Sequence, residues 1–185
     1  MNLSEDFSIS WVAPIVPSKS LAGIKLDTDY KSFSIILEKY SIGDGESAYR
    51  FEKSPILRLD SNDLDREGNG GYSFSLFHDE MVSKNKKGVP ALSVMFKNWK
   101  IYAIKAYDFS FPGEPAQKLI YKGTFPSGAG LGSFVSDLLP FSDLEFDEGE
   151  EWFYTDEKYG AVEITGWSAP LEDQPNQLIT AICVI

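Results

Sequence analysis

Residues 91–107 read ALSVMFKNWKIYAIKAY, two segments of alternating apolar and polar side chains joined by Asn98 and Trp99. Alternation with a period of two is typical of a β-strand that buries one of its faces. The short connection between the two segments predicts a tight hairpin. We therefore expect an antiparallel sheet that extends outward from this hairpin.

The same alternation recurs along the rest of the chain, between turns that are rich in glycine and proline. The sequence Asn-Gly-Gly at residues 69–71 is the strongest of these turn signals and precedes one of the alternating segments. The further predicted strands are residues 7–11, 48–51, 56–59, 72–77, 118–125, 152–154, 161–165 and 178–185.

Helical spacing of apolar residues is rare in this sequence. Residues 27–40 carry apolar side chains every three or four positions, and Asp27 or Thr28 can cap the start while Gly43 ends the segment. Residues 133–139 are a second, shorter candidate. We predict an α+β fold, a mostly antiparallel sheet with about two short helices.

The two predicted helices lie in similar surroundings, which suggests an internal duplication. Each follows a glycine-containing segment and precedes an acidic turn, a strand, a second turn and a second strand. The first unit spans residues 20–60, with its acidic turn at 44–46, and the second spans 127–166. We expect one domain over residues 1–185 that contains these units as a pseudo-duplicated α/β/β pair.

Composition and charge restrict the classes of ligand. The chain has 185 residues, of which 43% are hydrophobic and 14% aromatic, enough for a packed core. Its net charge of -11 disfavours nucleic acid and anionic membranes as partners, because both would be repelled. Glu5 and Asp6 stand where a signal peptide needs positive charge, and no apolar run approaches a membrane span. We expect a cytoplasmic protein.

Residues suited to catalysis or metal binding are few and scattered. His78 is the only histidine and Cys183 the only cysteine, and neither has a catalytic motif around it. We expect an exposed His78 and a Cys183 that packs as a small apolar residue. The chain is therefore predicted to be no enzyme and to bind no metal or cofactor. Its many carboxylates still leave glycosidase chemistry open.

Two loops imitate ligand-binding motifs without completing them. Residues 63–68 match the first positions of a calcium-binding EF-hand loop, but Phe74 stands where the motif needs a bidentate glutamate. The alternate glycines of residues 128–132 imitate a phosphate-binding turn, yet no further glycine or Lys-Ser/Thr pair follows at the required spacing. We expect a solvated hairpin loop and a tight connection into a helix.

Acidic residues concentrate between Asp143 and Glu157, where eight occur without a basic residue. Aromatic side chains lie among them, a composition that favours a protein interface in which carboxylates steer and pair with Lys or Arg. A solvated loop is the alternative. The predicted partner-binding residues are Asp143, Glu145, Asp147, Glu148, Glu150, Glu151, Trp152, Tyr154, Asp156 and Glu157.

Four short motifs carry a likeness to a known family. They are AGIKL at residues 22–26, YKG at 121–123, AGLGS at 129–133 and GAVEI at 160–164. In this respect the chain resembles immunity proteins of bacterial polymorphic toxin systems, such as contact-dependent growth inhibition systems. The likeness covers roughly residues 20–60 and 118–185.

The resemblance implies a stoichiometric inhibitor that binds and neutralises a cognate toxin domain. Such toxins are often nucleases, and an acidic inhibitor can imitate the phosphate backbone that their basic clefts bind. The resemblance places no catalytic residue on the chain. Two alternatives stay open: an acidic secretion chaperone, and a carbohydrate-binding or carbohydrate-active β-domain that uses Trp152 and Trp167.

Overall fold

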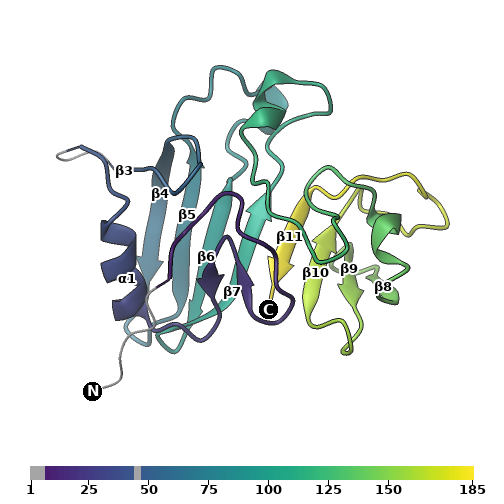
Figure 1. Cartoon of the computed structure of the whole chain (residues 1–185), viewed down its shortest axis with the longest axis horizontal. Helices are drawn as coiled ribbons and strands as arrows, with labels where there is room; N and C mark the ends of the chain where they lie inside the picture. Colours follow the sequence, from purple (N-terminus) through teal and green to yellow (C-terminus); the bar gives the residue numbers. More distant parts are fainter. Residues whose placement is uncertain (1–6, 44–46) are drawn as a thin grey trace.

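The computed structural model describes residues 7–43 and 47–185, and it is mostly antiparallel sheet, as predicted. Within this part of the chain, nine strands form one sheet in the order β3-β4-β5-β6-β7-β11-β10-β9-β8 (Figure 1). The strands are β3 (Ala48–Tyr49), β4 (Leu57–Leu64), β5 (Gly70–Leu76), β6 (Leu92–Lys97), β7 (Lys100–Tyr107), β8 (Leu144–Asp147), β9 (Trp152–Thr155), β10 (Val162–Thr165) and β11 (Ala181–Val184).

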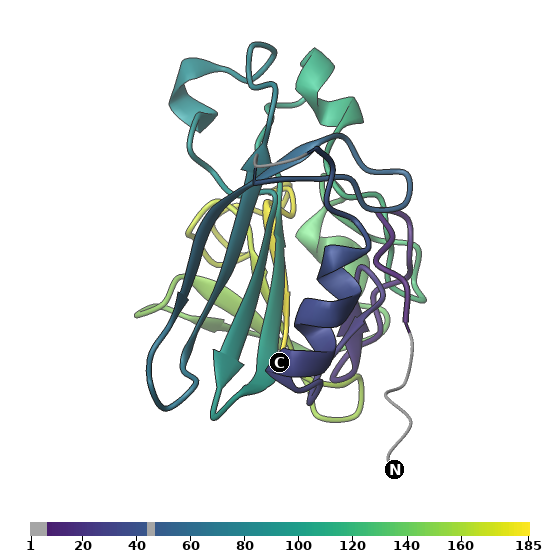
Figure 2. The same ribbon diagram turned by 90° about the vertical axis from the view of Figure 1, so that its left-hand side faces the viewer.

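One face of the sheet is covered and the other is not. Helix α1 (Tyr30–Glu38) and the segment that holds the small hairpin of β1 (Ser20–Leu21) and β2 (Ile24–Lys25) pack on the covered face (Figure 2). The 3-10 helix η3 (Val135–Leu138) adds two buried side chains to the same core. In the described part of the chain no further layer lies on the opposite face, called here the uncovered face (Figure 2).

Two further 3-10 segments lie in the connections. The segment η1 (Lys84–Lys86) lies between β5 and β6, and η2 (Pro115–Lys118) follows β7. The described residues include no helix with the length and apolar character required to cross a membrane.

The hairpin predicted at Asn98 and Trp99 is confirmed. It joins β6 to β7, and its two central residues have φ values of 52° and 66°, the left-handed backbone that a two-residue hairpin turn requires. The Trp99 ring packs against Gly68, where an added Cβ would come within 2.3 Å of the indole Cγ. The glycine is therefore required for the indole to cover the β4–β5 turn.

The predicted helix at residues 27–40 is confirmed in type but not in its start. The cap is Asp29, whose carboxylate accepts a hydrogen bond of 3.0 Å from the Ser32 backbone N–H. Asp27 cannot begin the helix because its φ of 61° is left-handed. The second predicted helix, residues 133–139, is only the four-residue 3-10 helix η3.

Two of the predicted strands are absent from the sheet. Residues 7–11 make a single bridge, between Ser10 and Glu52. Residues 118–125 are extended in part and alternate in burial, but they pair irregularly with the N-terminal segment, as where Ile15 donates to the Thr124 carbonyl. Alternation predicts which side chains are buried without showing whether a neighbouring strand is present.

The two units of the predicted duplication lie at opposite ends of the sheet. The first supplies α1, β3 and β4, and the second supplies η3, β8, β9 and β10. The first unit has a nine-residue α-helix, whereas the second has a four-residue 3-10 helix at the corresponding place. The acidic turn predicted at residues 44–46 lies outside the described residues. The duplication stays a prediction.

Candidate binding surface

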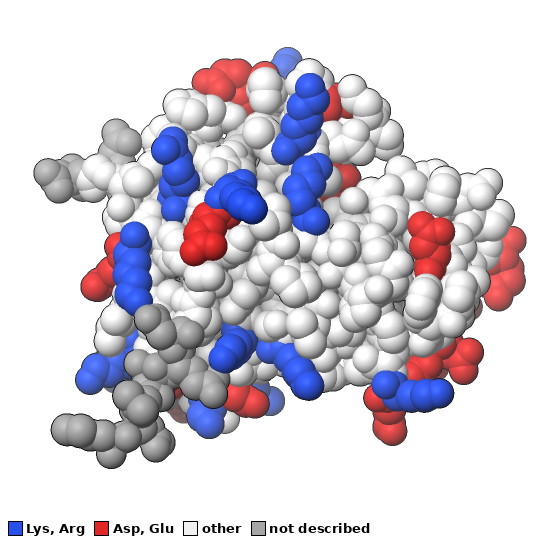
Figure 3. All heavy atoms as spheres, in the orientation of Figure 1, with Lys and Arg blue, Asp and Glu red and all other residues white. Residues whose placement is uncertain are grey.

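The negative charge of the protein belongs to one end of the sheet. Residues 123–185 contain 12 acidic residues and a single basic one, Lys158, whereas residues 1–122 contain 16 of each. The acidic third of the chain folds into η3 and strands β8–β11, the half of the sheet beyond β7. Figure 3 shows Lys and Arg distributed over the other half of this view, while charged atoms at the β8–β10 end are mostly Asp and Glu. We call this half the acidic end.

The predicted acidic segment forms the β8–β9 hairpin at the edge of the sheet. Glu145 pairs in register with Tyr154, and Asp147 pairs with Trp152. The pairing of Tyr154 with Glu163 of β10 places these side chains on the uncovered face. The turn of residues 148–151 holds three further acids, all exposed. The structure therefore brings most of the predicted acids together on one hairpin.

The carboxylates of two of the predicted acids accept hydrogen bonds from nearby backbone N–H groups of the protein. Asp147 Oδ1 accepts hydrogen bonds of 2.7 and 3.0 Å from the N–H groups of Gly149 and Glu150, which shapes the hairpin turn. The Asp156 carboxylate accepts from the N–H groups of Tyr159 and Asp143. These bonds hold the pKa of Asp156 below its usual value. Asp156 therefore acts mainly as a structural clamp at the base of the hairpin.

Part of the aromatic content of the segment is unavailable to a partner. The rings of Phe146 and Phe153 lie 4.9 Å apart and pack into the core on the covered face. Trp152 and Tyr154 are half-buried on the uncovered face. Desolvation and the nearby carboxylates of the hairpin and of Glu163 raise the pKa of Tyr154.

The register of the sheet aligns polar residues in one row across the uncovered face. Each strand from β4 to β8 in the spatial order of the sheet contributes one residue to it. The row is Ser61, Ser73, Ser93, Lys105, Cys183, Glu163, Tyr154 and Glu145. Small hydroxyl side chains thus occupy one half of the row, and ionisable side chains occupy the half at the acidic end.

Lys105 and Glu163 form the centre of this row. The Lys105 Nζ lies 3.5 Å from the ring centroid of Trp152 and 5.0 Å from that of Tyr107, a cation–π arrangement. Burial lowers the pKa of Lys105 and raises that of Glu163. Attraction to Lys105 opposes the rise at Glu163, and repulsion from Glu150 adds to it. Neither residue was predicted from the sequence, because both belong to strand segments that showed only alternation.

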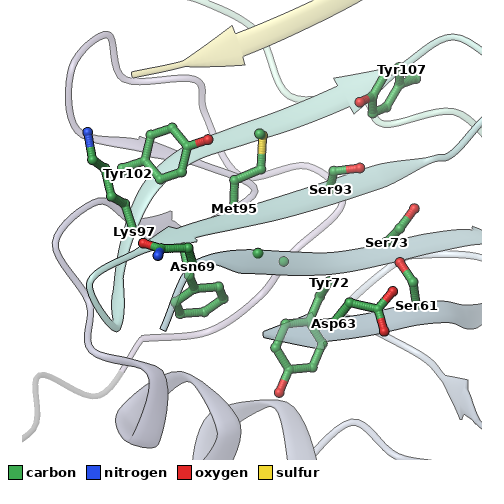
Figure 4. A pocket seen from close by; sticks show the side chains of 13 residues that line it. Ser61, Asp63, Asn69, Tyr72, Ser73, Ser93, Met95, Lys97, Tyr102 and Tyr107 are labelled. Atoms are coloured by element: carbon green, nitrogen blue, oxygen red, sulfur yellow. The ribbon is translucent and has the colours of Figure 1, made fainter. Parts of the chain in front are cut away.

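A hollow of about 720 Å³ lies on the uncovered face and is lined by residues of β4 to β7. The three serines of the row help to line it, and Figure 4 shows them with Asp63, Tyr102 and Tyr107. Small side chains on its floor leave the sheet backbone accessible, while Tyr102 and Met95 are exposed at its wall. The hollow therefore belongs to the neutral half of the sheet.

The single cysteine and the single histidine of the sequence lie in different environments. Cys183 is 2% exposed, and burial raises the pKa of its thiol to about 12, which leaves the thiolate unpopulated near neutral pH. His78 is exposed beside the Phe77 ring. Both positions agree with their prediction.

The loop that resembles an EF-hand is a β-hairpin turn. The Asp65 carboxylate accepts hydrogen bonds from the N–H groups of Glu67 and Asn69 and from the Asn69 amide. Asp63 and Leu64, the first two residues of this predicted loop, belong to β4. In the described ranges, 7–43 and 47–185, no group of three or more His, Cys, Asp or Glu residues is placed to hold a metal ion.

A search of protein-family models, of curated proteins and of solved structures found no match to this chain.

Proposed function

We propose that this protein is a binding protein that captures a basic partner protein through its acidic end. The observation that carries this proposal is the segregation of charge, since the last 63 residues hold 12 acids against one lysine and fold into one end of the sheet. Like charges at this density repel one another and cost stability. A cationic partner offsets that cost on binding and is attracted from a distance.

The motifs that resemble polymorphic-toxin immunity proteins indicate what kind of partner is bound and what the binding achieves. On this basis we infer that the partner is a cognate toxin domain and that binding neutralises it, as an immunity protein does. A nuclease toxin offers a basic cleft, and the carboxylates of the β8–β9 hairpin can imitate the phosphates that the cleft binds. The hairpin carries these acids at the sheet edge, where a partner can reach them.

The carbohydrate alternative is less well supported by the aromatic side chains. Trp11 is 2% exposed and belongs to the core. One face of the Trp152 indole is occupied by the Lys105 ammonium. A sugar platform needs an open ring face, so of the predicted pair only Trp167, which is exposed, keeps most of its ring accessible.

Co-purification tests the proposed function. The chain is produced together with the toxin-domain candidate encoded by the neighbouring gene, and the mixture is separated by size exclusion at low and high salt. We expect a complex of fixed stoichiometry that forms at low salt and weakens as salt increases. Separate elution of the two proteins at low salt would contradict the proposal.

A further inference from the structure

A tight protein interface requires apolar side chains at its centre as well as charges around it. The β8–β9 hairpin provides the charges, but its Phe146 and Phe153 are core residues and its Trp152 is covered in part by Lys105. An acidic interface at this end of the molecule therefore needs its apolar anchors from another element.

Among the described residues of the acidic end, three of the four exposed large apolar side chains lie at η3, and the fourth is Trp167. Phe134 at its N-terminus is 45% exposed, and Leu139 and Phe141 at its C-terminus are 50% and 53% exposed. We call these three residues the η3 shoulder. Scattered exposed apolar residues are normal on a protein surface. Here three large side chains fall within one eight-residue segment.

The η3 shoulder is held rigidly by buried and hydrogen-bonded neighbours. Val135 and Leu138 are fully buried beneath it. The Ser142 backbone N–H donates to the Leu138 carbonyl, and the Ser142 hydroxyl accepts from the Asp156 N–H at 2.9 Å. The shoulder is therefore tied to the end of β9. A surface that is ordered before binding loses less conformational entropy when it is buried.

Acidic residues border the shoulder. Asp137 of η3 and Asp143, two positions after Phe141, are both exposed. Glu157 is exposed one position beyond the Asp156 clamp. The η3 segment, green in Figure 1, lies on the covered side of the sheet, and hydrogen bonds between Ser142 and Asp156 tie it to the end of the hairpin that carries the remaining acids. An apolar centre with an acidic border is complementary to an apolar patch bordered by Lys and Arg.

We propose that the η3 shoulder is the apolar anchor by which the acidic end holds the basic partner protein. The proposal rests on the proposed function and assigns association and dissociation of the complex to different residues. Carboxylates of the hairpin accelerate association, whereas Leu139 and Phe141 determine how slowly the complex dissociates. The sequence predicted aromatic contacts from Trp152 and Tyr154 within the acidic segment, and this proposal adds apolar contacts from η3, which precedes that segment.

Binding kinetics of variants test this proposal, with the toxin-domain candidate from the neighbouring gene as the probe. We compare the wild type with Leu139→Ala/Phe141→Ala and with Phe141→Lys. Ile35→Ala, at a residue of α1 that is 54% exposed at the far end of the sheet, is the matched control. Thermal unfolding followed by circular dichroism verifies that each variant is folded.

The double alanine variant should dissociate about tenfold faster or more, as truncated hot spots do, with the salt dependence of association unchanged. Phe141→Lys should dissociate faster still, because it places a cation opposite a basic partner, and Ile35→Ala should behave as wild type. Wild-type dissociation rates for both shoulder variants would overturn the anchor and leave the proposed function intact. Failure of the wild type to bind the probe would overturn both.

Discussion

Lys105 and Glu163 flank Cys183 on the uncovered face, where both are partly buried. Each has its pKa moved in the direction that favours the neutral form, and burial is the largest cause in both cases. Burial thus disfavours the charged form of each of these two side chains. Shifts of this kind are common at functional sites.

Replacement of Glu163 by glutamine should stabilise the fold near neutral pH. The raised pKa of Glu163 means that its favourable contribution is present below the unfolded pKa and is lost as pH rises through the folded value. The melting temperature of Glu163→Gln should therefore exceed that of the wild type at pH 7, and the difference should shrink toward pH 4. A melting-temperature difference that stays constant from pH 7 to pH 4 would show that burial does not destabilise the Glu163 carboxylate.

Gly123 is required by crowding rather than by a left-handed backbone. A Cβ at this position would lie 2.0 Å from the Ala13 carbonyl oxygen and on top of the Tyr121 hydroxyl that donates to it. We expect Gly123→Ala to destabilise the protein by about 3 kcal/mol or more in chemical unfolding. At Gly113 an added Cβ would meet no atom within 4 Å. Gly113→Ala should therefore lower the free energy of unfolding by only about 1 kcal/mol, the cost of holding alanine at a positive φ. Equal costs would contradict the crowding argument.

At the scale of elements, α1 depends on its cap and on its buried stripe. Asp29 satisfies both the backbone N–H and the hydroxyl of Ser32, at 3.0 and 2.7 Å. Phe33, Ile36 and Leu37 then pack onto the covered face of the sheet. The cap fixes the first turn and so determines which side chains of the helix face the core.

Asp29→Ala should lower the free energy of unfolding by about 1 kcal/mol, the usual cost of a lost N-cap. The hydrogen bonds from Ser32 lower the pKa of Asp29, so this contribution is present above the unfolded pKa of about 3.8 and is lost as pH falls. Asp29→Asn keeps the acceptor and should retain most of the stability. Unfolding curves of the three proteins at pH 7 and pH 3 provide the measurement, and an alanine variant as stable as wild type would refute the cap.

Alternation in the sequence predicted most strands of the sheet but not the pairing between them. The β6–β7 hairpin was recognisable because its two strands are adjacent in sequence and joined by a two-residue turn. The pairing of β7 with β11 joins residues far apart in the chain, and nothing local specifies it. Residues 118–125 failed for the same reason, since their burial alternates without a partner strand in the sheet.

The candidate site was predictable to a similar extent. The acids between Asp143 and Glu157 were found because their concentration is a local property of the sequence. Lys105 and Glu163 escaped notice because only the register of β7, β11 and β10 places them in one row. Phe134 and Leu139 of the η3 shoulder escaped because apolar residues in a predicted helix are normally assigned to the core, and Phe141 follows the predicted helix as a single apolar residue.

At the scale of the whole molecule, the dominant feature is an acidic half joined to a neutral half. The acidic end should repel itself most strongly when little salt is present. We therefore expect Glu148→Gln/Glu150→Gln/Glu151→Gln to melt at a higher temperature than the wild type at low ionic strength and to lose this advantage in high salt. An unchanged melting temperature at low ionic strength would mean that the turn acids are too well solvated to interact.

A matched set of amide variants separates local from overall charge. Glu52, Glu67 and Glu80 are exposed residues of the neutral half, and their conversion to glutamine changes the net charge by the same amount. The rise in melting temperature at low ionic strength should be absent or smaller in this control, because its changes lie outside the acidic end.

The most direct test of the account is the association rate with the protein encoded by the neighbouring gene, the proposed partner, measured across a range of salt concentrations. We expect the wild-type rate to fall steeply as salt increases, because carboxylates of the acidic end steer the encounter. The turn variant should associate more slowly and with a flatter salt dependence, while the Glu52/Glu67/Glu80 control should follow the wild type closely. Equal rates and equal salt dependence for the wild type and the turn variant would contradict capture of the partner by the acidic end.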